Sequence, residues 1–151
     1  MKHLSGLIAS AAVLLAVQVY AQGCGAAAAC SAAAAAEAKA AEPGILNPAG
    51  LDALLKAKVS VTVLDARSGK YDDGRRIPGA KSLNSTSSAE EIAKVIPSKE
   101  SLVVTYCSNL KCPASARLAK HLAGLGYSNI LELPQGIDGW AAEGRPVEKV
   151  N

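Results

Sequence analysis

Two short runs of β-branched and apolar residues constrain this fold more than any other feature of the sequence. They occupy residues 59–65 and 102–106. Runs of this length and composition are typical of buried β-strands. Helical patterns alternate with these and with weaker strand patterns along residues 44–142. The alternation predicts an α/β fold with a mostly parallel central sheet flanked by helices on both faces.

The weaker elements are recognised by their boundary residues. Asn47 is placed to cap a helix that has Pro48 at its first position. Ser88 and Glu91 have the spacing of a capping box. We therefore expect strands at residues 45–46, 59–65, 81–84, 102–106 and 127–133, and helices at residues 48–56, 89–95, 114–124 and 137–142.

Composition limits the classes of protein to which the chain can belong. Its 151 residues allow one domain plus accessory segments. Phenylalanine is absent and aromatic residues make up 3% of the chain, so the core must be aliphatic. The formal net charge of +3 is scattered, without a basic stripe or an aromatic platform. We therefore expect no nucleic acid partner.

The N-terminus has the pattern of a targeting segment. Lys2 and His3 form a short positive start, and an apolar run over residues 4–19 follows. The run ends in Val-Tyr-Ala, which has the small-residue pattern of a cleavage site. The segment predicts a signal peptide over residues 1–21 and export to the periplasm or cell envelope.

Residues 22–43 are nearly all alanine and glycine, which predicts a flexible linker before a domain over residues 44–151. Cys24 in this linker follows Ala-Gln-Gly, and the four residues resemble a bacterial lipobox. Lipidation of Cys24 would anchor the chain in the membrane, and without it we expect no membrane contact. The alternatives are an incidental cysteine and a disulfide with Cys30.

Cys107 marks the expected functional site. It directly follows the strand at residues 102–106, and a helix over residues 114–124 begins after a short loop. Loop amides and the positive end of this helix would converge on the sulfur and favour the thiolate. Because functional loops of such sheets lie outside the carboxyl ends of the strands, Asp65, Cys107 and the loop after Leu133 should lie together.

Five motifs occur in a fixed order along the chain. They are Leu-Asp-Ala-Arg at 64–67, Ile-Pro-Gly-Ala at 77–80, Tyr-Cys at 106–107, Leu-Pro-Gln-Gly-Ile-Asp-Gly-Trp at 133–140 and Ala-Glu-Gly-Arg-Pro-Val at 142–147. Their order and spacing resemble the successive signatures of a rhodanese-like domain. The resemblance covers roughly residues 44–150 and implies the rhodanese-like α/β fold.

The resemblance also implies a reaction. In this family the loop cysteine takes a sulfane sulfur from a donor of the thiosulfate or polysulfide type, holds it as a persulfide and passes it to a thiophilic acceptor. Cys107 would be this nucleophile, and Arg67 would assist anion binding or brace the loop. The backbone amides that would cradle the persulfide belong to Ser108, Asn109, Leu110, Lys111 and Cys112. The implied partners are a small sulfur-containing anion and a thiol acceptor, including a protein thiol, and neither a metal nor an organic cofactor is implied.

Two residues of the cysteine loop depart from the family pattern. Leu110 stands where the loop often has glycine, and Cys112 stands where it often has the arginine that binds the anionic donor. Lys111 is the only cation in the loop sequence. We therefore expect poor turnover of thiosulfate or a preference for another donor.

Cys112 leaves several interpretations open. Its thiol could attack a Cys107 persulfide, releasing sulfide and leaving a disulfide, or it could protect Cys107 from over-oxidation. It could also be a small apolar filler at the helix start. Three hypotheses follow for the chain: a sulfurtransferase, a thiol redox protein that cycles a Cys107–Cys112 disulfide, and a non-catalytic binding module with the same fold.

Overall fold

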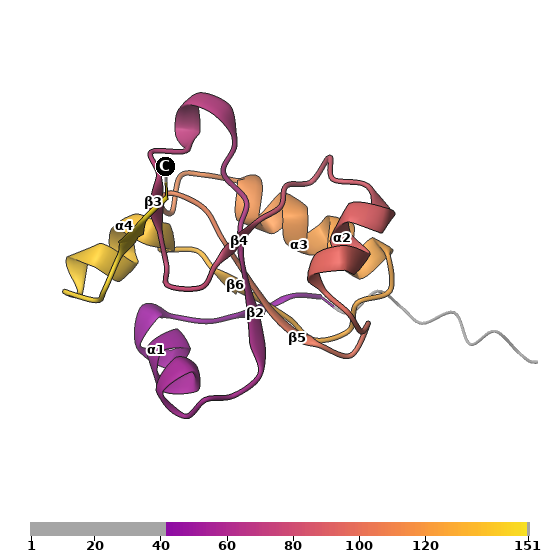
Figure 1. Cartoon of the computed structure of the whole chain (residues 1–151), viewed down its shortest axis with the longest axis horizontal. Coiled ribbons are helices and arrows are strands. Elements are labelled where there is room, and N and C mark those ends of the chain that lie inside the picture. The colour runs from indigo at the N-terminus through magenta and orange to yellow at the C-terminus, as the bar shows by residue number, and fades with distance from the viewer. Residues whose placement is uncertain (1–41, 151) are drawn as a thin grey trace, which may run out of the picture. The chain divides into compact units, whose positions relative to one another are not determined.

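The structure is a computed structural model that describes residues 42–150 (Figure 1). Its main sheet has five strands in the order β1-β6-β5-β2-β4, and all neighbouring strands are parallel. These strands are β1 (Gly44–Ile45), β2 (Val61–Asp65), β4 (Lys81–Ser82), β5 (Leu102–Tyr106) and β6 (Ile130–Leu133). The predicted parallel sheet is confirmed, and β5 is its central strand.

Helices cover both faces of the sheet, as predicted. They are α1 (Pro48–Lys56), α2 (Ala89–Val95), α3 (Ala114–Gly124) and α4 (Gly136–Ala142). Figure 1 shows α1 and α4 on one side of the sheet and α2 and α3 on the other. Successive residues of β5 face opposite sides of the sheet. Val103 lies in the same buried cluster as Leu122 of α3, whereas Val104 lies in the same buried cluster as Trp140 of α4.

Local signals explain where the helices begin. The Asn47 side chain accepts a hydrogen bond from the Gly50 N–H at 2.7 Å, and Pro48 opens α1. Ser88 and Glu91 form the predicted capping box of α2. These caps satisfy backbone donors that the first helical turn leaves without partners, so the boundaries follow from the sequence.

A second, two-stranded sheet joins residues 68–76, which follow β2, to the end of the described chain. A 3₁₀ helix (Gly69–Tyr71) opens this segment, and β3 (Arg75–Arg76) then pairs antiparallel with β7 (Glu148–Lys149). Neither strand was predicted from the sequence, because each is two residues long and polar and so has no periodic pattern. The pairing ties the end of the domain to the loop after β2.

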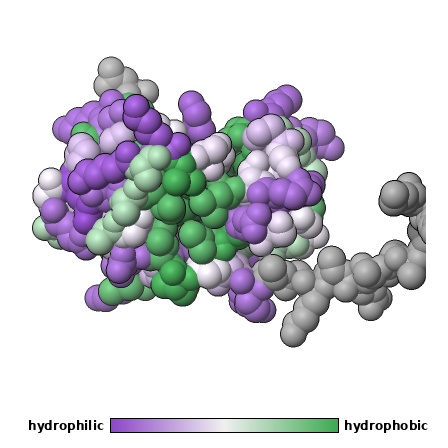
Figure 2. All heavy atoms as spheres, turned by 90° about the horizontal axis from the view of Figure 1, so that it is seen from below, coloured by the Kyte–Doolittle hydropathy of each residue, from purple (hydrophilic) through white to green (hydrophobic). Residues whose placement is uncertain are grey.

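The surface of the domain is mixed. Figure 2 shows a hydrophobic area between hydrophilic flanks on one face. The exposed large apolar side chains are those of Ile45, Val59, Tyr71, Leu110 and Val150. Among residues 42–150, every helix is too short or too polar to cross a membrane.

Several predictions about the N-terminus fall outside the described residues. The signal peptide over residues 1–21, the lipidation of Cys24 and nearly all of the linker over residues 22–43 belong to this part of the chain. They remain predictions.

Candidate functional site

The predicted site lies at the carboxyl edge of the sheet. Cys107 directly follows the central strand, and the Ala66 N–H donates to the Tyr106 carbonyl at 2.8 Å as the chain leaves β2. The first turn of α4 closes the other side, where the Ile137 N–H donates to the Cys107 carbonyl at 2.9 Å. The segments that follow β2, β5 and β6 therefore lie together, as expected.

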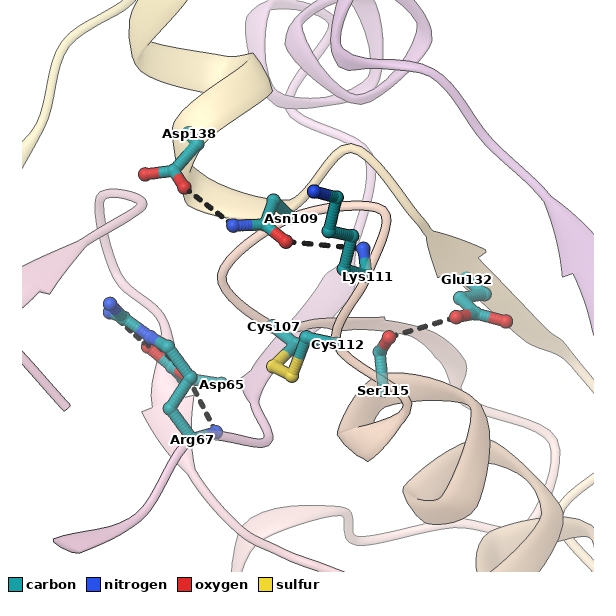
Figure 3. Close-up of a disulfide and its surroundings, with 9 residues drawn as sticks. All are labelled: Asp65, Arg67, Cys107, Asn109, Lys111, Cys112, Ser115, Glu132 and Asp138. Carbon is teal, nitrogen blue, oxygen red and sulfur yellow. Dashed lines mark hydrogen bonds and ion pairs between the residues drawn. A yellow bond between two sulfur atoms is a disulfide. The ribbon is translucent and has the colours of Figure 1, made fainter. Parts of the chain in front are cut away.

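Cys107 and Cys112 form a disulfide across the loop (Figure 3). Their Cα atoms are 6.2 Å apart, a separation that a disulfide can span. Cys107 is 2% exposed, whereas Cys112 is half-buried. The loop thus brings a second, more accessible sulfur against the predicted nucleophile.

Backbone contacts with α4 hold the start of the loop. The Asp138 N–H donates to the Ser108 carbonyl at 3.0 Å. This hydrogen bond is adjacent to the one from the Ile137 N–H to the Cys107 carbonyl. Gly136, which begins α4, has a φ of +61°, a region that disfavours side chains. A Cβ at this position would lie 2.4 Å from the Cys107 carbonyl oxygen, so glycine is needed for this close approach.

Asn109 organises the rest of the loop. Its carbonyl accepts the Cys112 N–H at 3.0 Å, and its Oδ1 accepts the Lys111 N–H at 3.1 Å. Its Nδ2 donates to Asp138 Oδ2 at 3.0 Å (Figure 3). Two of the five amides expected to cradle a persulfide are therefore already engaged, and a cradle would rely on the other three.

A cavity of about 510 Å³ opens beside the disulfide. The segment after β2, the cysteine loop and the start of α3 line it, and among residues 42–150 no aspartate or glutamate does. Lys111 and Arg117 do line it. Both are exposed, and neither forms an ion pair with a carboxylate of the described residues. This balance of charge favours an anionic ligand.

The two cations differ in their placement. Figure 3 shows the Lys111 side chain on the outer side of the loop, directed away from the two sulfur atoms. Arg117 lies in the first turn of α3, and long helical side chains point back toward the helix N-terminus, here toward the cysteine loop. Sequence reasoning missed Arg117 because it considered only cations inside the loop.

Arg67 is buried in an ion-pair network. Its Nη2 lies 2.8 Å from Asp65 Oδ2, its Nη1 lies 2.7 Å from Asp73 Oδ1, and it also donates to the Arg75 carbonyl. Arg67 lines the cavity, but Figure 3 shows its guanidinium turned toward Asp65 and away from the sulfur atoms. Of its two predicted roles, this geometry fits bracing of the loop.

The network extends to the loop of Cys107. Arg76 bonds Asp72 and holds the pKa of that carboxyl at about 2. Arg75 Nη2 lies 2.8 Å from Asp138 Oδ1. The hydrogen bond from Asn109, together with Arg75, lowers the pKa of Asp138 below its ordinary value. A chain of charged contacts therefore links the loop after β2 to the cysteine loop.

Three further residues have simpler places. Ser108 lines the cavity, and Leu110 is 74% exposed. The Nε2 of His121 lies 3.1 Å from the Ser87 carbonyl oxygen, and His121 does not line the cavity. Within residues 42–150, no three His, Cys, Asp or Glu side chains are grouped so that they could hold a metal ion.

The sequence of the domain matches a known family model. The family model of the rhodanese-like domain matches residues 47–143. No curated protein matches the chain.

Solved structures share the fold. A protein from Bacillus halodurans is 27% identical, with a TM-score of 0.62 over 70% of this chain and 77% of that one. A rhodanese-related protein from Thermoplasma volcanium is 26% identical, with a TM-score of 0.55 over 70% of this chain and 97% of that one. A thiosulfate sulfurtransferase from Pseudomonas aeruginosa is 24% identical, with a TM-score of 0.54 over 72% of this chain but 21% of that one.

The five motifs expected to mark this family all lie in or beside the region that the family model matches. The α/β architecture agrees with that of the solved structures. The chain belongs to the rhodanese-like domain family.

Proposed function

We propose that this chain is a sulfurtransferase in which Cys107 carries a sulfane sulfur as a persulfide. The observation that supports it most is the position of Cys107, at the end of the central strand and beside a cavity lined by Lys111 and Arg117. Donors of the thiosulfate type are anions, so they suit a cavity that no carboxylate of the described residues lines.

The chemistry starts from the reduced loop, because only a thiolate is nucleophilic. The Cys107 thiolate attacks the outer sulfur of thiosulfate, the sulfur–sulfur bond of the donor breaks, and sulfite leaves with the bonding electrons. The Cys107 persulfide then gives its outer sulfur to a thiol acceptor or to cyanide, which regenerates the thiolate. The start of α3 and the loop amides favour the anionic forms of Cys107. These steps need neither a metal nor an organic cofactor.

Intact mass spectrometry tests the proposal. The sample is the full chain with Cys24, Cys30 and Cys112 replaced by serine, reduced and then treated with thiosulfate or polysulfide. We expect a gain of one sulfur atom that cyanide removes and that Cys107→Ser abolishes. An unchanged mass in both this chain and the chain that keeps Cys112 would contradict sulfur transfer.

The disulfide favours a second candidate, a thiol redox protein that cycles Cys107 and Cys112. In that case Cys112→Ser would abolish oxidoreductase activity, and neither this variant nor its parent would take up sulfur. The third hypothesis, a non-catalytic binding module, predicts no change in mass with any donor and a cellular phenotype that survives Cys107→Ser.

We also propose that the chain is exported, because residues 1–21 have the pattern of a signal peptide. Lipidation of Cys24 would hold it at the membrane. The mass of the mature protein recovered from the producing cell decides between a free N-terminus and a diacylglycerol-modified Cys24.

A further inference from the structure

We propose that Cys112 resolves the Cys107 persulfide, so that the carried sulfur leaves as sulfide and the loop closes as a disulfide. A dithiol reductant then reopens the loop. This inference rests on the proposed function, because it requires that Cys107 first take up a sulfane sulfur. It assigns the chain a reductive, sulfide-releasing activity in addition to transfer of sulfur to an outside acceptor.

The loop geometry supports this role for Cys112. The two cysteines are joined in the disulfide that the resolving step would produce, so the loop can bring the two sulfur atoms into bonding contact. The Asn109 carbonyl holds the Cys112 N–H at 3.0 Å, and the Asn109 side chain is tied to Asp138 at 3.0 Å. The Cys107 carbonyl is held by Ile137. The start of the loop is thus attached to α4 directly, and Cys112 is connected to α4 through Asn109, which keeps Cys112 beside Cys107.

The resolving step balances in atoms and electrons. The Cys112 thiolate attacks the inner sulfur of the Cys107 persulfide, Cys107–S–SH. The bond between the inner and outer sulfur breaks, and the outer sulfur leaves as HS⁻ with the bonding electrons. Two cysteine sulfurs are oxidised to a disulfide and one sulfane sulfur is reduced to sulfide.

The closed loop cannot accept another sulfur, because Cys107 then has no thiolate. A dithiol restores it: one thiolate of the reductant attacks Cys112, the disulfide breaks, and Cys107 leaves as the thiolate. The second thiol of the reductant then releases Cys112 and leaves the reductant as a disulfide. Attack falls on Cys112 because it is half-buried, whereas Cys107 is 2% exposed. The partner class is therefore a dithiol, small or carried on a protein.

A single-turnover experiment tests the inference. The full chain with Cys24→Ser and Cys30→Ser is reduced with dithiothreitol, freed of reductant and given one equivalent of thiosulfate. We expect about one sulfide per chain and a mass lower by two hydrogen atoms. A second portion of thiosulfate should yield no sulfide until the chain is treated with dithiothreitol again.

Variants separate the steps. Cys112→Ser should keep the added sulfur and release no sulfide, and Cys107→Ser should do neither. Asn109→Ala should slow sulfide release more than sulfur uptake, because it removes the side-chain bonds to Asp138 and to the Lys111 N–H that hold the loop, and it keeps the Asn109 backbone amide beside the donor.

The outcomes distinguish the two proposals. A stable persulfide on the parent chain, or equal sulfide release from Cys112→Ser, would overturn the resolving role and leave sulfur transfer intact. Absence of sulfur uptake even in Cys112→Ser would overturn the proposed function itself.

Discussion

The loop after β2 (residues 67–76) and the loop after β5 (residues 107–113) leave neighbouring parallel strands at the same edge of the sheet. The arginines of the first loop differ in one respect from the cations of the second. The arginines of the first loop, Arg67, Arg75 and Arg76, all form ion pairs with aspartates. Lys111 in the second loop, and Arg117 just after it, form none with the carboxylates of the described residues.

The difference separates structural from ligand-binding charge. A buried cation whose donors are all used cannot give them to a ligand without leaving a buried carboxylate unpaired. An exposed, unpaired cation that lines a cavity can bind an anion at little structural cost. The first loop is therefore expected to govern stability, and the second to govern the donor.

The largest effect is expected from Arg67→Met. This change leaves the fully buried Asp65 without its closest cation, and breaking a buried pair costs about 3–5 kcal/mol. Urea denaturation of the full chain should show a loss of this size in the free energy of unfolding. Lys56→Gln is the control, because the Lys56 side chain is 77% exposed and such a pair contributes about 0.5 kcal/mol or less. Equal losses in the two variants would contradict the structural role of Arg67.

Gly136→Ala is expected to have the next largest effect. The substitution combines a φ of +61° with a Cβ 2.4 Å from the Cys107 carbonyl oxygen, and we expect a destabilisation of about 3 kcal/mol. Sulfur uptake by Cys107 should fall as well, because the carbonyl has to move. Gly79→Ala is matched to it: φ is +76°, but nothing lies within 4 Å of the added Cβ.

Gly79→Ala should therefore cost about 1 kcal/mol, the penalty of the left-handed conformation alone. It should leave sulfur uptake unchanged. If both glycine variants lose the same stability and neither loses uptake, α4 does not hold the cysteine loop in the way described.

Much of the fold could be predicted because its signals are local. The bounds of α1, α3 and β5 agree with the expected ones, since caps, Pro48 and a β-branched run mark them in the sequence. The pairing of β3 with β7 could not be predicted. It joins segments about seventy residues apart, and short polar strands give no pattern that would indicate a partner.

In the site, too, the features with local signals could be predicted, and the contacts between distant segments could not. The positions of Cys107 and the Asp65–Arg67 pair follow from strand ends, which the sequence reveals. Their partners depend on the fold: Asp73 approaches Arg67 only when the loop after β2 is in place. The approach of Gly136 to Cys107 likewise depends on how α4 packs.

Arg117→Gln tests the ligand-binding role of the unpaired cation just after the cysteine loop. It should leave the free energy of unfolding unchanged but raise the thiosulfate concentration needed for half-maximal sulfur uptake about tenfold, or about 1.4 kcal/mol, close to one hydrogen bond to a charged group. Uptake from an uncharged organic trisulfide should not change. Lys120→Gln, an exposed cation of the same helix that does not line the cavity, should behave like the parent chain. A tenfold loss with the uncharged donor too would contradict anion binding by Arg117.

The last effect is one of pH and is expected from Asp72, at the partly exposed side of the paired network. Its pKa is about 2 because Arg76 bonds the carboxylate, below the ordinary value of about 3.9. A carboxyl whose pKa is lower in the folded than in the unfolded chain stabilises the fold above the unfolded pKa, and this contribution is lost as pH falls toward 2.

The difference in unfolding free energy between the parent chain and Asp72→Asn should therefore be constant near neutral pH and shrink between about pH 4 and pH 2. Urea denaturation at several pH values measures it. In an Arg76→Gln background the same substitution should give a difference that no longer depends on pH, because the cause of the lowered pKa is gone. A difference that keeps its full size at pH 2 in the parent background would mean that Asp72 acts through its shape rather than its charge. The loop after β2 would then owe its order to packing, and the contrast with the cysteine loop would rest on Arg67 alone.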